Sequence, residues 1–320
     1  MVEMISQTGL VVACLLDLLL GDPEWSFHPI RILGKTIDYL EKSLRGIKQN
    51  MISEKTAGIL LCVITITLAY GITFGIIHFA YKLNSYFGAS LAILLAYFTI
   101  SIKSLGDAAG KIRKCLKDED DESAGRHLSF IVGRDALALS RKEIVRATVE
   151  TVAENTSDGI VAPLFYLILG GPALGMAYKA VNTLDSMVGY KNEKYLKLGW
   201  ASARCDDLAN YIPARITGIL MIVAAIFLGK DWKNAYATLR KDAKKHISPN
   251  SGYPESAVAG ALRVQLGGVN YYAGNKKVTP LLGQDIEELS GKSIEGTVRM
   301  MYLVSSMMIL LGVLFLEVLK

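Results

Sequence analysis

Residues 143–190 read EIVRATVETVAENTSDG, then the apolar run IVAPLFYLILGGPALGMA, then YKAVNTLDSMVGY. A carboxylate-rich helix therefore leads into a segment apolar enough for a bilayer, and a second polar group of residues follows it. The first group places three carboxylates four residues apart, on one face of a helix: Glu150, Glu154 and Asp158. The second group contains Lys179, Asn182, Asp185 and Ser186. Ionisable groups at both ends of an apolar segment are costly to bury, so they are candidates for functional residues.

Apolar residues elsewhere in the 320-residue chain also gather in runs that approach the roughly 20 residues needed to cross a bilayer. These runs are Ile5–Gly21, Ala57–Ala80, Tyr86–Ile102, Ile160–Val181, Ile212–Gly229 and Val298–Leu319. The first run lacks a basic start and a cleavage site, so we interpret it as a retained span or a membrane-buried helix. The pattern predicts an all-α, polytopic integral membrane helical bundle with about five or six membrane segments and amphipathic helices in its loops. We expect residues 1–320 to form a single membrane-embedded domain.

The distribution of charge predicts an orientation in the membrane. Lys and Arg are plentiful in 22–56, 103–159 and 230–297, and six spans with both termini outside would place these loops in the cytoplasm. We therefore expect a multi-pass protein of the cell membrane with cytoplasmic active loops. The net charge of +5 gives no indication of nucleic acid as a partner. The four cysteines have no close pairing, which favours packing thiols over disulfides or a metal site.

Local signals place several helix boundaries. Pro29 suits the first turn of an amphipathic helix, and His28 before it either binds a substrate group or serves as a capping or interface histidine. Ser140 followed three residues later by Glu143 predicts a capping box. The break at 170–172, Gly-Gly-Pro, predicts a kinked, broken or re-entrant helix.

Other pairs have a plain structural interpretation. Arg146 and Glu150 are spaced as an ordinary surface ion pair, worth only about 0.3–0.5 kcal/mol. Gly71 and Gly75 form a G-x-x-x-G pattern, which is typical of close helix packing.

Two further stretches carry polar side chains. In the first, Arg204, Asp206 and Asp207 lie together, and the two carboxylates either hold a divalent cation or form a salt-bridged helix end. In the second, residues 248–256 read SPNSGYPES, which predicts a rigid polar turn followed by a helix that opens at Pro254-Glu255-Ser256. Gly291-Lys292-Ser293 resembles the end of a P-loop, but Ile286 stands where the first glycine must be. Any nucleotide would therefore bind at a non-standard site.

Six long segments of this chain resemble the CbiB/CobD family, the adenosylcobinamide-phosphate synthases of cobalamin biosynthesis. They are LLDLLLGDPEWSFHPIR, VGRDALALSRKEIVRATVETVAENTSDGIVAPLF, YKAVNTLDSMVGYKNEKY, GWASARCDDLANYIPARITG, SPNSGYPESAVAGALRVQLGG and NYYAG, in order from residue 15 to 274. The resemblance implies an integral membrane ligase that joins adenosylcobyric acid to (R)-1-amino-2-propanol O-2-phosphate and gives adenosylcobinamide phosphate. It also implies ATP and Mg²⁺. The partners expected are these substrates, the lipid bilayer and other enzymes of the corrinoid pathway.

Given that chemistry, we assign hypothetical roles to the polar side chains. Making an amide from a carboxylate needs activation, most simply as an acyl phosphate, and phosphoryl transfer needs Mg²⁺ and cations on the phosphates. The metal shell would comprise Asp158, Asp185, Asp206 and Asp207. The cations on phosphate would be Lys179, Arg204 and Arg134. Glu154 would accept the amine proton, and the amide rim of the corrin would contact Asn155, Asn182, Asn250 and Ser251.

Two other classes of function remain open on spacing alone. Several spans, a Gly-Gly-Pro break and buried ionisable groups also suit a membrane transporter of a small polar or corrinoid ligand. A non-catalytic membrane organiser would have little need for polar clusters at membrane depth. The topology leaves a conflict too, because six simple spans put 182–211 outside, away from the other motifs. This conflict would be removed by a re-entrant segment, or by polar clusters that lie at membrane depth inside the helical bundle.

Overall fold

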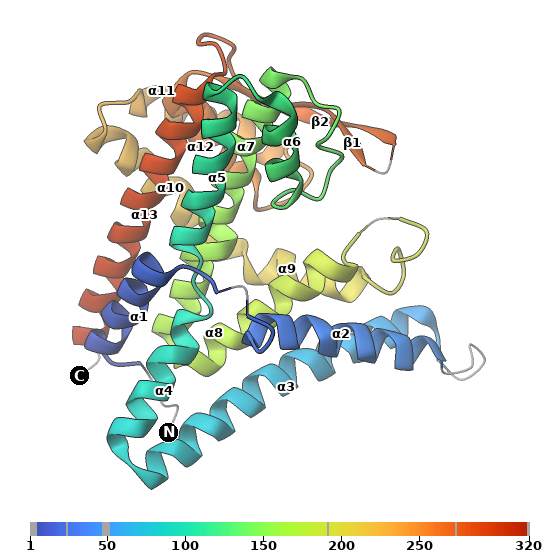
Figure 1. The fold of residues 1–320 in the computed structure, drawn as a ribbon, viewed down its shortest axis with the longest axis vertical. Helices are drawn as coiled ribbons and strands as arrows, with labels where there is room; N and C mark the ends of the chain where they lie inside the picture. Colours follow the sequence, from blue (N-terminus) through green and yellow to red (C-terminus); the bar gives the residue numbers. More distant parts are fainter. Residues whose placement is uncertain (1–4, 24, 47–51, 191, 273, 319–320) are drawn as a thin grey trace. The chain divides into compact units, whose positions relative to one another are not determined.

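The computed structural model describes residues 5–23, 25–46, 52–190, 192–272 and 274–318. Helices dominate these ranges, and within them the only sheet is one antiparallel pair of strands (Figure 1). The predicted all-α membrane bundle is confirmed, and the small hairpin is an addition that the sequence interpretation missed.

Four helical runs in the described part of the chain are long and apolar enough to cross a membrane: Glu54–Leu83, Ser85–Lys117, Arg141–Val188 and Gly291–Val318. A fifth follows if Trp200–Ala209 and Tyr211–Phe227 are counted as one interrupted span. The first predicted segment forms only α1 (Gln7–Leu20), whose 14 residues are too few for a simple span. Its length suits the alternative interpretation, a membrane-buried helix.

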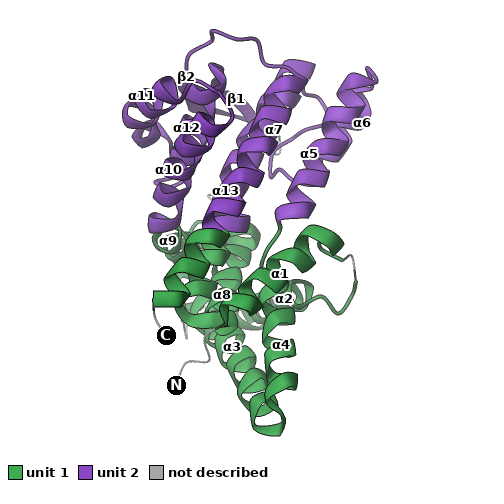
Figure 2. Ribbon diagram, turned by 90° about the vertical axis from the view of Figure 1, so that its left-hand side faces the viewer, with its two compact units in different colours: residues 1–101, 162–210, 309–320 green, residues 102–161, 211–308 purple. Residues whose placement is uncertain are grey.

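The chain divides into two compact units, each built from separate stretches of sequence (Figure 2). Unit 1 comprises residues 1–101, 162–210 and 309–320, and unit 2 comprises residues 102–161 and 211–308.

Unit 1 is organised by an apolar core among helices that are distant in sequence. Besides α1 it contains α2 (Pro29–Gly46), α3 (Glu54–Leu83), α4 (Ser85–Tyr97), α8 (Ala162–Val188) and α9 (Trp200–Ala209). Helix α2 begins at Pro29 and is amphipathic, as predicted, and it turns Leu33 and Ile37 towards Leu61 of α3 and Leu184 of α8. Helices α3 and α4 form a helical hairpin, and the Asn84 side chain between them accepts hydrogen bonds from the first amides of α4.

The Gly-Gly-Pro break distorts α8 inside unit 1. Gly170 and Gly171 both leave helical geometry, and Gly171 has φ 67° and ψ −168°. Only glycine adopts that conformation without strain, and Pro172 removes the amide that a regular helix would use next. The predicted kink is therefore confirmed.

Unit 2 holds the remaining helices and the hairpin. Its helices are α5 (Ile102–Lys117), α6 (Asp121–Ser129), α7 (Arg141–Thr156) with a π-turn at Ser157–Val161, α10 (Tyr211–Phe227), α11 (Trp232–Asp242) with a 3₁₀ turn at Ala243–Lys245, α12 (Gly252–Leu262) and most of α13 (Gly291–Val318). The strands are β1 (Gln265–Tyr272) and β2 (Asn275–Gly283), with a bulge between Leu266 and Gly268.

Helix α7 places the first polar group of the sequence. It starts with the predicted capping box, because the Glu143 carboxylate accepts hydrogen bonds from the amide and hydroxyl of Ser140 at 2.8 and 2.7 Å. Both Ile144 and Val149 are buried, and so is Glu150 on another face. A helix buried on several sides can carry charged groups only if other parts of the fold pair with them.

Candidate functional site

The predicted site residues are divided between the two units. Unit 2 holds Arg134, Glu154, Asn155, Asp158, Asn250 and Ser251, and unit 1 holds His28, Lys179, Asn182, Asp185, Arg204, Asp206 and Asp207. That the halves on either side of the Gly-Gly-Pro break face one another stays a prediction.

In unit 2 the polar turn before α12 reaches the acidic face of α7. The Ser251 hydroxyl donates a hydrogen bond of 2.7 Å to Oε1 of Glu154. The turn is fixed by Ser248, whose Oγ accepts from the amides of Asn250 at 3.2 Å and Ser251 at 3.3 Å. Both Asn250 and Ser251 are buried, whereas Glu154 is half-buried. The structure thus brings together Glu154 and Ser251, two residues predicted for the site.

Glu150, one turn before Glu154, is held by two arginines. Its carboxylate lies 2.5 Å from Nη2 of Arg134 and 3.6 Å from Nη1 of Arg146, and it accepts the Gly267 amide at 2.7 Å. Side chains of Arg146 and Glu150 are only 10% and 8% exposed, so the prediction of a surface ion pair is wrong. Local spacing could not show that the β1 strand covers this pair.

Asn270 of β1 completes this network. Its Oδ1 accepts hydrogen bonds from Arg134 and, at 3.1 Å, from Nη2 of Arg146. Burial opposes the charged form of Arg134, but the Glu150 carboxylate outweighs it, so the pKa of Arg134 lies above its ordinary value. Arg134, which we predicted to bind phosphate, therefore already has a carboxylate and an amide oxygen as partners.

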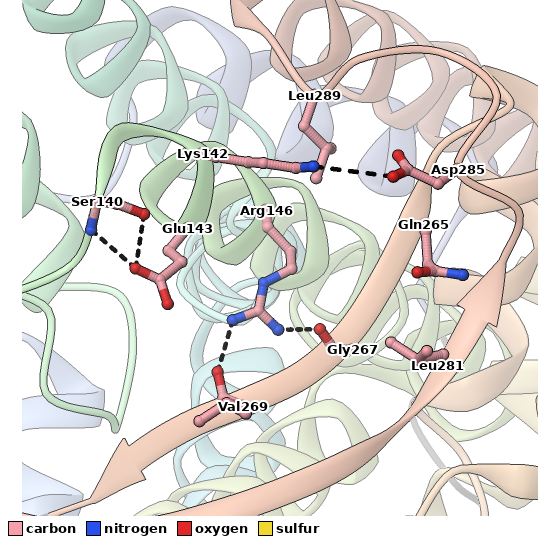
Figure 3. Close-up of a pocket in the computed structure, with 10 residues that line it drawn as sticks. All are labelled: Ser140, Lys142, Glu143, Arg146, Gln265, Gly267, Val269, Leu281, Asp285 and Leu289. Carbon is pink, nitrogen blue, oxygen red and sulfur yellow. Dashed lines mark hydrogen bonds and ion pairs between the residues drawn. The ribbon is translucent and has the colours of Figure 1, made fainter.

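Arg146 also forms one wall of a pocket of about 380 Å³ (Figure 3). Its guanidinium donates to the carbonyl oxygens of Gly267 and, at 2.8 Å, Val269, which ties α7 to β1. Lys142 and Asp285 lie 3.8 Å apart at another edge of the pocket. Through this pocket, solvent or a ligand can reach the Arg146 side chain of the network.

Glu255 is a functional candidate that the sequence did not reveal. It stands in the first turn of α12, only 5% exposed, and His246 Nε2 lies 3.9 Å from its Oε1. Burial, and then the nearby carboxylates of Glu150 and Glu154, raise the pKa of Glu255 well above its ordinary value. A glutamate in a first helical turn is common on exposed helices, so nothing in the local pattern marked this one as buried.

Two further predicted residues of unit 2, Asn155 and Asp158, lie at the end of α7 and just after it. The Asn155 amide donates to the carbonyl oxygen of Thr151 at 3.0 Å, within its own helix. Asp158 lies in the π-turn after α7, a type of distortion that is frequent at functional sites. Neither role assigned to these two residues is tested by this placement.

In unit 1 the second cluster joins α8 to α9. Asp206 accepts a hydrogen bond of 3.0 Å from Asn210 and another from Asn182, and it lies close enough to Asp185 and Asp207 to interact electrostatically. Tyr178 anchors the group by donating to Oδ1 of Asn210 at 2.8 Å. Arg204 pairs with Asp207 at 3.4 Å and is largely exposed. The structure therefore gathers three predicted residues, Asn182, Asp185 and Asp207, around the carboxylate of Asp206.

The chemistry of this cluster suits a hard cation. Among the described residues, no group of three or more His, Cys, Asp and Glu side chains is arranged to hold a metal ion. Mg²⁺, however, is commonly held by one or two carboxylates together with substrate phosphates and water. Asp185 and Asp206 supply carboxylate oxygens of that kind, so a Mg²⁺ site here stays a prediction that fits the donors.

His28 has different neighbours from those of the Asp185–Asp206 cluster. Its Nε2 is 2.7 Å from Oδ1 of Asp22, its Nδ1 accepts the Ile30 amide at 3.3 Å, and its ring packs edge-on against Phe98. The side chain is 3% exposed. Of the two interpretations of His28, these contacts favour a capping and interface role.

Comparison with known proteins gives a consistent result along the chain. A family model described as CobD/Cbib protein matches residues 10–301. The chain is 47% identical over 309 residues to the cobalamin biosynthesis protein CobD of Geobacter metallireducens, covering 96% of both chains. It is 48% identical to the CobD of Pelobacter propionicus, covering 92% of this chain and 90% of that one, and 44% identical to a CobD of Leptospira interrogans, covering 93% of both.

No solved structure matches the chain. The family match nevertheless spans both units and all the segments that carry the two clusters. This chain belongs to the CobD/Cbib family of cobalamin biosynthesis.

Proposed function

We propose that this protein forms the amide bond between adenosylcobyric acid and (R)-1-amino-2-propanol O-2-phosphate, with consumption of ATP. Membership of the CobD/Cbib family supports a role in cobalamin biosynthesis. The observation that favours this reaction is the hydrogen bond between Ser251 and Glu154 beside buried Glu255.

An amine is protonated at neutral pH and cannot attack a carbonyl carbon until it loses a proton. Glu154 is half-buried and oriented by Ser251, so it has the surroundings of a general base. Carboxyl groups with different surroundings can divide acid and base roles, and here burial raises the pKa of Glu255 above its ordinary value. We assign the amine proton to Glu154.

The reaction balances as an acyl-phosphate sequence. The carboxylate of adenosylcobyric acid attacks the γ-phosphorus of ATP and ADP leaves. The amine nitrogen then attacks the acyl carbon, phosphate leaves, and the amine proton passes to Glu154. Mg²⁺, when bound, would neutralise charge on the phosphates, and we propose Asp185 and Asp206 as the carboxylates that would hold it, with Asp158 and Asp207 as further candidates.

The remaining assignments concern binding. Lys179 and Arg204 would neutralise phosphate charge in unit 1, where Arg204 is exposed enough to meet a ligand. In unit 2 the amide rim of the corrin would contact Asn155, Asn250 and Ser251, and Asn182 of unit 1 is a further candidate for the same role. Arg134 would act mainly through Glu150, since that carboxylate occupies one face of its guanidinium.

The test is a reconstituted reaction. Full-length protein in detergent would be incubated with ATP, Mg²⁺, adenosylcobyric acid and aminopropanol phosphate, and products read by mass spectrometry. We expect adenosylcobinamide phosphate, ADP and phosphate in equal amounts. Movement of a corrinoid or a small polar ligand across sealed vesicles, without amide formation, would instead identify a transporter.

Several apolar helices fit a membrane protein, and we propose a multi-pass orientation in the cell membrane with the active loops in the cytoplasm. Lys194 lies on an exposed turn of unit 1, and Lys276 is exposed near the start of β2 in unit 2. Single cysteines placed there should both react with a membrane-impermeant maleimide from the cytoplasmic side of inverted vesicles. Labelling of either from the opposite side would contradict this topology.

A further inference from the structure

Unit 2 contains a large groove away from the Glu154–Ser251 contact. It has a volume of about 1070 Å³ and lies among the end of α5, the start of α7 and the start of α13. Six cationic side chains line it: Arg113, Lys114, Lys117, Arg141, Lys142 and Lys292. Only two carboxylates, Glu288 and Glu295, share the lining. The groove is thus strongly positive.

Three of the six cations already have acidic partners. Arg113 pairs with Glu295 at 2.6 Å, Arg141 with Asp121 at 2.9 Å, and Lys142 with Asp285 at 3.8 Å. Within the described ranges, no ion pair or hydrogen bond engages the ammonium groups of the other three: Lys114, Lys117 and Lys292. Like charges gathered without counter-charges repel one another, and a bound anion would relieve that repulsion.

The groove also has an apolar lining. Leu116, Val145 and Leu289 contribute side chains to it, and none of them is more than 6% exposed. A ligand with only a phosphate would leave this part of the groove unused. A ring attached to the phosphate would cover it, since ligand sites of this size combine apolar walls with a few polar contacts.

Helix α13 adds to the positive field. Its first residues, Gly291 and Lys292, line the groove, and the N-terminal end of a 28-residue helix carries a partial positive charge. Lys292 also lines a neighbouring hollow of about 500 Å³ together with Lys230 and Arg263. A ligand held at Lys292 therefore has room on both sides.

The position of Lys114 favours a soluble ligand over a lipid headgroup. The apolar run that precedes α5 ends at Ile102, and Lys114 lies 12 residues further along a continuous helix. At 1.5 Å per residue that is about 18 Å, well beyond the roughly 5–8 Å of a headgroup layer.

We propose that this groove binds a soluble phosphate-bearing ligand with an apolar ring, the chemistry of a nucleotide. The assignment stands on the charge and shape of the groove, and it holds whether or not the chain forms the amide. It provides a binding site for such a ligand without a P-loop.

The experiment is calorimetric titration of full-length protein in detergent with ATP, tripolyphosphate, AMP and adenosine, without corrinoid. We expect ATP to bind more tightly than tripolyphosphate or AMP, adenosine to bind least, and ATP affinity to fall as salt is raised. Replacing all three free lysines (Lys114→Gln, Lys117→Gln, Lys292→Gln) should weaken ATP binding on the order of tenfold or more, equivalent to at least ~1.4 kcal/mol. The test is repeated in a Lys179→Gln, Arg204→Gln background, which removes the phosphate cations proposed for unit 1, and ATP affinity that persists there in the triple-lysine variant would overturn the proposal.

Lys111→Gln is the matched control, because Lys111 is exposed on the same helix but does not line the groove. It should bind ATP like the wild type, and an equal loss would mean that only overall charge matters. Tripolyphosphate binding as tight as ATP would exclude a role for the apolar lining.

A last experiment places the wild type and the lysine variant in nanodiscs with and without phosphatidylglycerol. A lysine-dependent preference for that lipid, with no ATP binding, would identify a headgroup site instead. Unchanged melting temperatures would show that the variants are folded.

Discussion

Ser251 donates its hydroxyl to the carboxylate of Glu154 at 2.7 Å, although 97 positions separate them in the chain. The contact joins a rigid polar turn to the acidic face of α7, inside a cluster that also contains Glu150 and Glu255. It therefore fixes the direction of a carboxylate that is half-buried and still accessible.

Glu154→Gln should lower kcat for amide formation by about 10²–10⁴-fold, the range expected when a general base is removed. Ser251→Ala should lower kcat about fivefold, because one orienting hydrogen bond is worth about 1 kcal/mol. Ser129→Ala, which removes an exposed hydroxyl that donates to the Arg126 carbonyl, serves as the control. Glu154→Asp, which keeps a carboxylate, should retain more of the rate than Glu154→Gln. A kcat for Glu154→Gln equal to that of the wild type would exclude Glu154 as the base.

Glu255 should make stability fall as the pH rises. Its pKa is raised in the folded protein, so above about pH 4.5, the ordinary value, the unfolded chain releases a proton that the folded chain still holds. Stability is therefore lost with increasing pH until the folded-state pKa is passed. Glu255→Gln removes this loss, and its melting temperature in detergent should exceed that of the wild type by a margin that grows from pH 5 to pH 8. Glu287→Gln, an exposed neighbour in unit 2, should show no such trend. A difference in melting temperature between Glu255→Gln and the wild type that stays constant from pH 5 to pH 8 would contradict this account.

Removing the Glu150 carboxylate should destabilise unit 2 strongly. Glu150→Gln leaves Arg134 and Arg146 buried without an acidic partner, and breaking a buried ion pair in this way costs about 3–5 kcal/mol. Glu295→Gln breaks the more exposed pairs with Arg113 and Arg299 and should cost no more than about 1 kcal/mol. Thermal unfolding in detergent compares the two. Equal losses would mean that solvent reaches Glu150 as freely as it reaches Glu295.

The features that the sequence predicted correctly are local. The capping box at Ser140, the helix start at Pro29 and the break at Gly171 each depend on residues within a few positions of one another. The membrane segments follow from composition over about 20 residues, a signal that is also local.

The features that it missed depend on distant contacts. The hairpin β1–β2 was not predicted because positive-φ glycines at Gly267 and Gly268 and a proline at Pro280 interrupt the strand pattern. Burial of Glu150 depends on Arg134 and on β1, which lies more than 110 residues further along the chain. No spacing within α7 encodes those neighbours, so a buried network had the same local pattern as a surface ion pair.

Alanine substitutions at the glycines of α3 should show which faces of this helix pack against neighbouring segments and which do not. A Cβ at Gly58 would lie 1.9 Å from the backbone oxygen of Leu198, so Gly58→Ala forces α3 away from its neighbour and should prevent stable folding. At Gly71 and Gly75, apart from the adjacent residues and the local backbone of α3, no atom of the described chain lies within 4 Å of such a Cβ, so the predicted close packing at this pair is wrong within one chain. Gly71→Ala should therefore fold normally, as judged by size-exclusion profile and melting temperature. Loss of the monodisperse peak in Gly71→Ala alone would reverse this assignment.

Cys62 and Cys205 should form a disulfide on mild oxidation, although they are 143 positions apart. Their sulfur atoms lie 3.4 Å apart between α3 and α9, and a disulfide bond of about 2.05 Å needs only a small approach. With diamide as oxidant, the two thiols lose two hydrogens to the diazene, and the bond formed links α3 to α9. Peptide mass spectrometry without reductant should recover the linked pair from a variant lacking Cys14 and Cys115. A variant that keeps only Cys14 and Cys115 should give no internal link. Failure of Cys62 and Cys205 to join, with both thiols alkylatable after unfolding, would show that α9 does not pack on α3 as described.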